Sequence, residues 1–335
     1  MSDKTEKKRL AILRLLLESG RPLGSSKIEE RLSAMGHEVS PRTVRYYLLG
    51  MDRDGLTENL GKRGRRITEQ GRRELDTARV IEKVGFLAAK IDRMTYRMSF
   101  DLAKKSGTVV INLSLLDPGQ LQKSAGLITR VFEKGYSMGQ LMGLFGPGER
   151  VGDFVIPEGM AALATVCSIT LNGVLLAHGI PTNSRFGGLL ELEDGEPVRF
   201  SEIITYAGTS LDPLEVFIRS GMTDYPGATT TGTGRIGVGF REVPADARDQ
   251  VIELARRCEK AELGGFLTIG WPSQPLLGVP VAEGRVGVIV IGGLNPVAIL
   301  EETALKVRSR ALAGLADYRL LFPYWELNQR IRGLI

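Results

Sequence analysis

Residues 40–51, Ser-Pro-Arg-Thr-Val-Arg-Tyr-Tyr-Leu-Leu-Gly-Met, decide the fold of the N-terminal segment because they carry its clearest helix signals. Ser40 is a favourable N-cap, and Pro41 suits the first helical position. An apolar stripe at helical spacing is expected to face inward: Val44, Tyr47, Leu48 and Met51. Four side chains are left on or near the outward face: Arg42, Thr43, Arg45 and Tyr46. Such a face suits the major groove of DNA, where arginine reads guanine edges and threonine or tyrosine contacts phosphate or the thymine methyl group.

Two further helices are predicted before this one. Residues 6–19 carry leucine and isoleucine at helical spacing. Ser25 or Ser26 can cap a second helix that runs to about Met35, and Glu29 is placed as the capping-box partner of Ser26. The segment therefore begins with three consecutive helices.

A basic hairpin is predicted after the third helix. Residues 56–60 and 66–68 read as short strands around Gly-Lys-Arg-Gly-Arg at 61–65. Its basic side chains are expected on phosphate or in the minor groove: Lys62, Arg63, Arg65 and Arg66. Three helices, this hairpin and the exit Ile-Thr-Glu-Gln-Gly-Arg-Arg together resemble the winged-helix family and predict a winged helix-turn-helix over residues 1–75. The alternative is a small helical domain with a solvated basic loop.

The charge distribution agrees with a DNA-binding N-terminal segment. The 335-residue chain has a net charge of +5, and residues 1–75 hold 17 Lys and Arg against 11 Asp and Glu. The rest of the chain is close to neutral, so the excess positive charge lies in the segment expected to meet a polyanion. No apolar run is a plausible membrane span, and the two cysteines, Cys167 and Cys258, are expected to be buried thiols of a cytoplasmic protein.

Residues 76–105 are predicted to connect two domains. Residues 76–100 read as one long helix with a 4-3-4-3-4 apolar seam: Val80, Val84, Leu87, Ile91, Met94 and Met98. The seam indicates either a helix packed on the following domain or a helix that forms a dimer and links the DNA-binding segment to a sensor.

The remaining region, residues 106–330, is predicted to be an α+β sensor domain. Its strands are expected at 107–113, 150–156, 164–177, 234–240 and 285–291, with helices at 117–134 and 244–260. We interpret this order as two degenerate copies of one unit, about 106–225 and 232–320, in which Gly292–Pro296 corresponds to His178–Asn183.

Motifs for catalysis, metal binding or cofactor binding are mostly absent, which indicates a protein that is not an enzyme and holds no cofactor or metal. Residues 232–237 match Gly-x-Gly-x-x-Gly, but a strand rather than a helix is expected to follow, so we interpret them as a join between the copies. The polar loop 178–188 can hold a carboxylate through arginine and backbone N–H groups. The candidate contacts are His178, Gly179, Thr182, Asn183, Ser184, Arg185, Gly292, Gly293 and Asn295. The alternative is a structural turn with a solvated arginine, and His178 alone is more often structural.

The chain resembles NrpR, a family of archaeal nitrogen-regulation repressors, along nearly its whole length. Four stretches carry the likeness: the helix with Arg42-Thr43-Val44-Arg45, the connector from Val84-Gly85-Phe86 to Phe100-Asp101, residues 173–181, and Ile-Gly-Gly-Leu-Asn-Pro at 291–296. The resemblance implies a cytoplasmic homodimer that binds inverted-repeat operators of nitrogen-assimilation genes and is released by 2-oxoglutarate. It also implies a single sensor domain, which works alone or with a second regulator protein.

Two other functions stay open from the sequence. A nucleotide bound near residues 232–237 would make the chain an enzyme fused to a DNA-binding head. The apolar seam of the connector would instead suit a module that is regulated by protein contacts alone.

Overall fold

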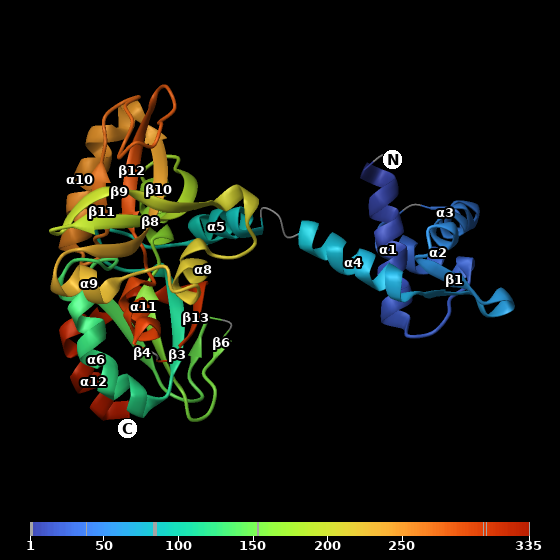
Figure 1. The fold of residues 1–335 in the computed structure, drawn as a ribbon, viewed down its shortest axis with the longest axis horizontal. Helices are drawn as coiled ribbons and strands as arrows, with labels where there is room; N and C mark the ends of the chain where they lie inside the picture. The colour runs from blue at the N-terminus through green and yellow to red at the C-terminus, as the bar shows by residue number, and fades with distance from the viewer. Residues whose placement is uncertain are drawn as a thin grey trace. The chain divides into compact units, whose positions relative to one another are not determined.

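The computed structural model describes residues 3–37, 39–82, 86–152, 154–303, 305 and 307–334. The chain divides into two compact units, Met1–Val84 and Gly85–Ile335 (Figure 1). The boundary lies beyond the predicted domain end at residue 75, because the helix that begins at Glu69 belongs to the first unit. None of the described helices combines the length and the apolar composition that a membrane span needs.

The first unit is a winged helix, as the sequence predicts. Its elements in chain order are α1 Asp3–Ser19, α2 Ser25–Ala34, α3 Pro41–Arg53, β1 Thr57–Asn59, β2 Arg65–Ile67 and α4 Glu69–Glu82. Strands β1 and β2 pair antiparallel to form the wing. Apolar side chains of α1, α2 and α3 make one buried core, with Ile12, Leu32 and Leu48 fully buried.

The predicted capping box of α2 is wrong. The helix starts two residues earlier than that motif requires, so its N-cap is Gly24 and no side chain caps it. Ser25 and Ser26 already lie in the first turn. Glu29 instead accepts a hydrogen bond from Ser33 Oγ at 3.3 Å, one helical turn further on.

The connector prediction is corrected in part. The described residues form α4 and a separate α5, Phe86–Arg97, which belongs to the second unit. Three seam residues of α5 are buried in the core of that unit: Leu87, Ile91 and Met94. Val84 and the side chain of Val80 lie outside the described residues. The packed-helix interpretation is therefore confirmed for α5, whose apolar face is not available to a partner.

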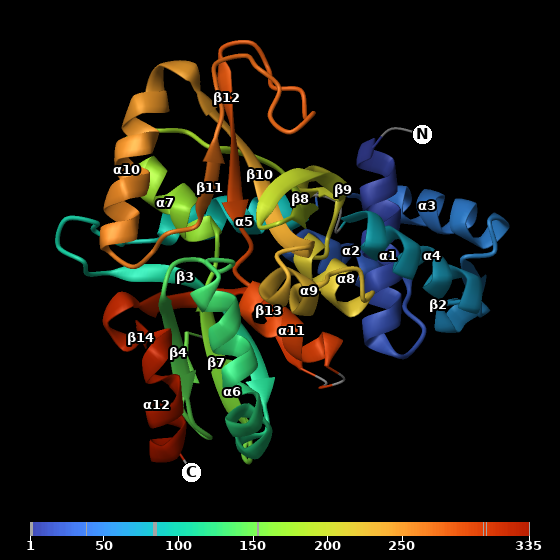
Figure 2. The same ribbon diagram turned by 60° about the vertical axis from the view of Figure 1, so that its left-hand side comes forward.

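The second unit contains two five-stranded antiparallel sheets (Figures 1 and 2). The first has the order β13-β3-β7-β4-β14 and the second β11-β12-β10-β8-β9. Strands of the first sheet are β3 Thr108–Leu116, β4 Leu141–Phe145, β7 Ala161–Val166, β13 Arg308–Asp317 and β14 Phe322–Pro323. Strands of the second are β8 Asn183–Glu193, β9 Glu196–Thr205, β10 Gly234–Pro244, β11 Phe266–Ile269 and β12 Arg285–Ile291. The helices are α6 Pro118–Glu133, α7 Ile169–Ala177, α8 Pro213–Arg219, α9 Tyr225–Thr230, α10 Arg248–Lys260, α11 Asn295–Glu302 and α12 Leu327–Leu334, and a small hairpin pairs β5 Arg150–Val151 with β6 Phe154–Val155.

The element order shows an internal duplication. The first copy runs β3, α6, β4, β7, α7, β8, and the second runs β10, α10, β11, β12, α11, β13. The last strand of each copy pairs with the first strand of the other: β8 with β10, and β13 with β3. Each sheet is therefore built from both copies.

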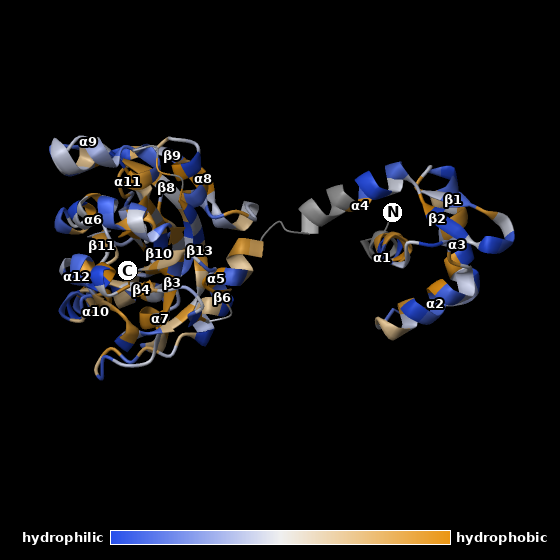
Figure 3. Cartoon of the chain, turned by 90° about the horizontal axis from the view of Figure 1, so that it is seen from below, coloured by the Kyte–Doolittle hydropathy of each residue, from blue (hydrophilic) through white to orange (hydrophobic). Residues whose placement is uncertain are grey.

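One predicted strand is a helix. Residues 164–177 divide into the end of β7 and the whole of α7. Every α7 residue from Ile169 to Leu175 is buried, so the run has no polar face whose period could distinguish a helix from a strand (Figure 3). The duplication then makes the β7–α7 turn the counterpart of the turn at 292–294, which corrects the predicted correspondence with His178–Asn183.

Candidate DNA-binding surface and ligand pockets

The outward face of α3 exposes three of the side chains predicted to read bases. Tyr46 is 71% exposed, and Arg42 and Arg45 are also exposed. In the described part of the chain, Arg45 engages only its Nε, which donates to Ser25 Oγ at 3.3 Å. Two guanidinium groups and a phenol are thus presented on one helix face, which is the chemistry that a major-groove reader needs.

Thr43 has a structural role in addition to any contact with DNA. Its backbone N–H donates to Ser40 Oγ at 3.1 Å, and the two hydroxyl oxygens are 2.9 Å apart. Ser40 is the N-cap of α3, with Pro41 in the first turn, as the sequence predicts. Thr43 therefore helps to fix the start of the helix that carries the reading face.

Arg65 ties the wing to the end of α3. Its Nε donates to Asp52 Oδ2 at 2.9 Å, and its side chain is only 14% exposed. The other oxygen of Asp52 accepts a hydrogen bond from Thr57 Oγ1 at 2.6 Å. The sequence placed Arg65 on DNA, whereas the structure uses its charge to hold the hairpin against α3.

The other basic residues predicted to contact DNA lie at or near the tip of the wing. Lys62 and Arg63 form an exposed turn, and no described residue makes a hydrogen bond or ion pair with either side chain. Arg66 pairs with Glu58 at 2.8 Å, but both side chains are at least half exposed, so the pair is weak and can open toward a phosphate. Lys62 and Arg63 are the best placed for phosphate contact.

The wing is also joined to the segment between α1 and α2. Leu23 and Arg65 form an isolated bridge, with backbone N···O distances of 3.0 and 2.9 Å. Gly64 lies beside this bridge with a φ of +99°, and a Cβ there would lie 2.4 Å from the carbonyl carbon and oxygen of Leu23. Only glycine permits both this backbone conformation and this close approach.

Gly64→Ala is expected to displace the wing and lower the affinity for duplex DNA about tenfold, because the phosphate contacts of Lys62 and Arg63 depend on its position. Fluorescence anisotropy with a labelled duplex measures this loss. Gly61→Ala is the matched control: its φ is also positive, +63°, but a Cβ there meets nothing within 4 Å. Equal affinities of the two variants would show that the bridge to Leu23 does not position the wing.

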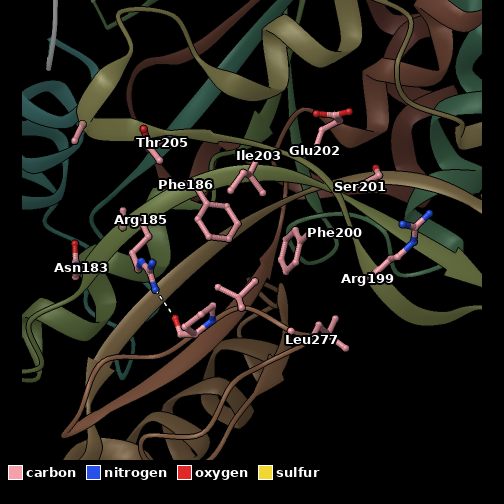
Figure 4. Close-up of a pocket in the computed structure, with 15 residues that line it drawn as sticks. Asn183, Arg185, Phe186, Arg199, Phe200, Ser201, Glu202, Ile203, Thr205 and Leu277 are labelled. Atoms are coloured by element: carbon pink, nitrogen blue, oxygen red, sulfur yellow. Dashed lines mark hydrogen bonds between the residues drawn. The ribbon is translucent and has the colours of Figure 1, made fainter.

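A cavity of about 820 Å³ in the second unit lies over strands β8 and β9 and is also lined by residues 277–280 (Figure 4). It holds three of the predicted effector residues: Asn183, Ser184 and Arg185. Arg185 Nη1 donates to Glu242 Oε1 at 2.8 Å and to the carbonyl of Pro280 at 2.7 Å. We call this cavity the β8–β9 pocket.

The β8–β9 pocket is nearly balanced in charge. Arg199, at the other end of the pocket in Figure 4, is paired with Glu191 at 2.7 Å. Glu202 adds a carboxylate, and Phe186 and Phe200 form an apolar wall with ring centroids 5.3 Å apart. A dianion would have to compete with Glu242 and Glu191 for both arginines.

The other predicted effector residues lie elsewhere. His178 ends α7, and its Nδ1 lies 2.8 Å from the carbonyl oxygen of Val174, so its role is structural. Gly292, Gly293 and Asn295 are buried at the start of α11. Gly179 and Thr182 do not line the β8–β9 pocket. The nine predicted residues therefore do not form one site.

A second pocket, of about 240 Å³, was missed by the sequence prediction. Its charged lining residues come from α5 and β13: Lys90, Arg93, Arg97 and Arg310. We call it the basic pocket. Three of these residues share one face of α5, and that pattern was the signal that could have found it, but Arg310 reaches them only through the fold.

The Gly-x-Gly-x-x-Gly match at 232–237 is a turn into a strand. Gly234 begins β10, and a Cβ there would lie 2.4 Å from the carbonyl oxygen of Asp224 and 2.5 Å from the backbone nitrogen of Ala228. The prediction that a strand follows is confirmed. The backbone around the motif is packed against α9 rather than open to a pyrophosphate.

Comparisons with known proteins agree with the two units. A family model described as NrpR regulatory domains NRD1 and 2 matches residues 84–322, and one described as Ribonuclease R winged-helix domain matches residues 10–75. The first match begins one residue before the second unit does.

Three curated relatives are similar over most of the chain. The global nitrogen regulator NrpRI of Methanosarcina mazei is 32% identical over 96% of this chain and 99% of its own length. The global nitrogen regulators NrpR of Methanococcus maripaludis and Methanocaldococcus jannaschii are 31% and 32% identical over 91% and 88% of this chain, which spans about half of each of them, 53% and 50%. A crystal structure of a nitrogen repressor-like protein from Methanococcus jannaschii matches with a TM-score of 0.60 and 27% identity, over 70% of this chain and 97% of that one.

Proposed function

Because the chain belongs to the NrpR family of global nitrogen regulators, we propose that it is a transcriptional repressor of nitrogen-assimilation genes that 2-oxoglutarate releases from its operator. The first unit binds DNA, and the second binds the effector. The observation that carries the DNA-binding part is the exposed pair Arg42 and Arg45 on a capped helix beside a basic wing.

The protein works as a cytoplasmic homodimer on inverted-repeat operators. Each winged helix presents one reading helix, so two copies related by a twofold axis match two related half-sites. The chain holds one winged helix followed by one sensor unit, and it aligns with 99% of the length of the NrpRI relative.

The effector acts by favouring a conformer that binds DNA poorly. A ligand shifts such an equilibrium only by its difference in affinity for the two conformers, so 2-oxoglutarate must bind the released form more tightly. A dicarboxylate needs cations or N–H groups that are not already neutralised by the protein.

Saturating 2-oxoglutarate is expected to lower the operator affinity about 5- to 150-fold, which is the usual range of allosteric coupling. Anisotropy titrations at constant ionic strength measure the effect, with succinate as the control for a dicarboxylate that lacks the keto group. In the absence of effector, the affinity should fall steeply with salt because counterions are released from the phosphates. An affinity that 2-oxoglutarate leaves unchanged would remove the sensing part of the proposal, and an affinity that does not depend on salt would remove the DNA-binding part.

A further inference from the structure

The basic pocket gathers four cations from two distant segments of the second unit. Lys90, Arg93 and Arg97 lie at positions i, i+3 and i+7 of α5, and Arg310 lies near the start of β13. All four line a cavity of about 240 Å³. Like charges this close repel one another unless an anion lies among them.

The described lining of the basic pocket contains no carboxylate. Its other residues are Met94, Gly152, Phe154 and Leu312–Leu315, and Asp153, a carboxylate that lies in the chain between two of them, is outside the described part. Within that part, no hydrogen bond or ion pair neutralises Arg93, Arg97 or Arg310. Burial lowers the pKa of Lys90 and the charge of Arg310 lowers it further, whereas the carboxylates of Glu215 and Asp212 act in the opposite direction.

The backbone of the pocket wall has an unusual shape. Residues 311–313 form a bulge in β13. Arg310 pairs with Leu113, and the next paired residue of β13 is Gly314, which lies opposite Ile111. Leu312 has a φ of +46°, a conformation that residues with a side chain rarely adopt.

Three hydrogen bonds hold this bulge in place. The N–H of Leu312 donates to Asn112 Oδ1 at 3.1 Å, Lys90 Nζ donates to the carbonyl of Ala311 at 3.3 Å, and the N–H of Ala311 donates to Glu215 Oε1 at 2.5 Å. The wall is therefore fixed by residues of β3, α5 and α8. Strained backbone of this kind persists where the surrounding structure determines it, and such positions gather at binding sites.

The size of the pocket limits its ligand. Its volume equals about eight waters at roughly 30 Å³ each, which suits a small metabolite and is too small for a nucleotide. The β8–β9 pocket is larger, but its arginines are paired with glutamates. Charge therefore favours the smaller pocket for a dianion.

We propose that the basic pocket binds a small anion with two negative charges, a dicarboxylate or inorganic phosphate, through Arg93, Arg97 and Arg310 with Lys90 at its base. Arginine forks suit carboxylate and phosphate oxygens alike. The inference rests on the proposed function only for the identity of the metabolite, 2-oxoglutarate.

The position of the site gives it a regulatory meaning. Three of the four cations belong to α5, the first helix of the second unit, which begins directly after the boundary with the winged helix. An anion that draws α5 toward Arg310 acts on the element from which the chain continues to the DNA-binding unit.

The test compares two double variants of the full chain that lose the same charge. Arg97→Ala with Arg310→Ala empties the basic pocket of two cations, and Arg185→Ala with Arg199→Ala does the same in the β8–β9 pocket. Calorimetric titrations use 2-oxoglutarate, inorganic phosphate and, as the singly charged control, acetate. Circular dichroism melts check that both variants fold. Arg97, Arg199 and Arg310 are exposed, whereas Arg185 is 35% exposed and pairs with buried Glu242, so the second variant is expected to melt at a lower temperature than the first.

The first variant is expected to bind a dianion about tenfold or more weakly than wild type, as for the loss of one charge-assisted hydrogen bond, while the second binds normally. If 2-oxoglutarate shows this pattern, the pocket is the effector site. If phosphate alone shows it, the pocket is an anion site and the proposed effector is wrong. Equal dianion affinities of the two variants, or the absence of binding to the wild type, would overturn the inference, and an effect of 2-oxoglutarate on DNA binding would still leave the proposed function standing.

Discussion

Arg42→Ala combined with Arg45→Ala is expected to lower the affinity for operator DNA about 100- to 1,000-fold, because each arginine contact with a base contributes about 1–3 kcal/mol. Both side chains are exposed on α3, whose start is fixed by Ser40 and Thr43. Neither side chain belongs to the core of the winged helix, so the variant should fold normally. Anisotropy titrations with an operator duplex selected by the wild-type protein measure the loss.

The specificity of that loss is tested with two controls. The affinity of the variant for a scrambled duplex should fall much less than its affinity for the operator, because phosphate contacts by the wing do not depend on sequence. Arg130→Ala with Arg256→Ala removes the same charge from exposed positions of α6 and α10 and should leave operator binding unchanged. If the α3 variant bound the operator like wild type, α3 would not be the reading helix.

Gly293→Ala is expected to destabilise the second unit by about 3 kcal/mol or more, a fall in melting temperature of roughly 10 °C. Gly293 lies in the turn before α11, where the two copies touch. A Cβ there would lie 2.4 Å from the carbonyl oxygen of Val166, 2.5 Å from Asn112 Nδ2 and 2.9 Å from Cys167 Cα. Two of these atoms are backbone, so the β7–α7 turn would have to move away.

Gly126→Ala is the matched control for this change. Gly126 is exposed within α6, and a Cβ there meets nothing within 4 Å, so alanine should stabilise the helix by about 0.5–1 kcal/mol. Differential scanning calorimetry of both variants gives the comparison. A melting temperature of Gly293→Ala within a degree or two of wild type would show that the copies can separate at this turn at little cost.

The winged helix could be predicted because its signals are local. A cap, a proline and an apolar stripe within residues 40–51 define α3, and glycines with basic residues define the wing. The role of Arg65 could not be predicted, because its partner Asp52 comes close only when the hairpin folds back on α3. From the sequence alone, an arginine within a basic run is expected to be exposed to solvent or to DNA.

In the sensor unit, sequence patterns predicted the order of elements but not every element or the binding pocket. The duplication was predicted from the order of elements, but α7 was taken for a strand because all its residues up to Leu175 are buried. The basic pocket depends on a contact between α5 and a bulge in β13 that Asn112 fixes across 200 residues of chain. The spacing of residues within one segment cannot predict a site whose residues come from segments so far apart in the sequence.

Because the last strand of each copy pairs with the first strand of the other, β3 and β13 can pair only late in synthesis on the ribosome. Strand β3 leaves the exit tunnel early, but its neighbour β13 follows only after some 200 further residues, roughly 10–40 s later at 5–20 residues per second. During that delay one edge of β3 has no partner and can pair with other chains. A gene fragment that encodes the first copy alone ends without β13 and leaves β8 without β10, so we expect it to aggregate.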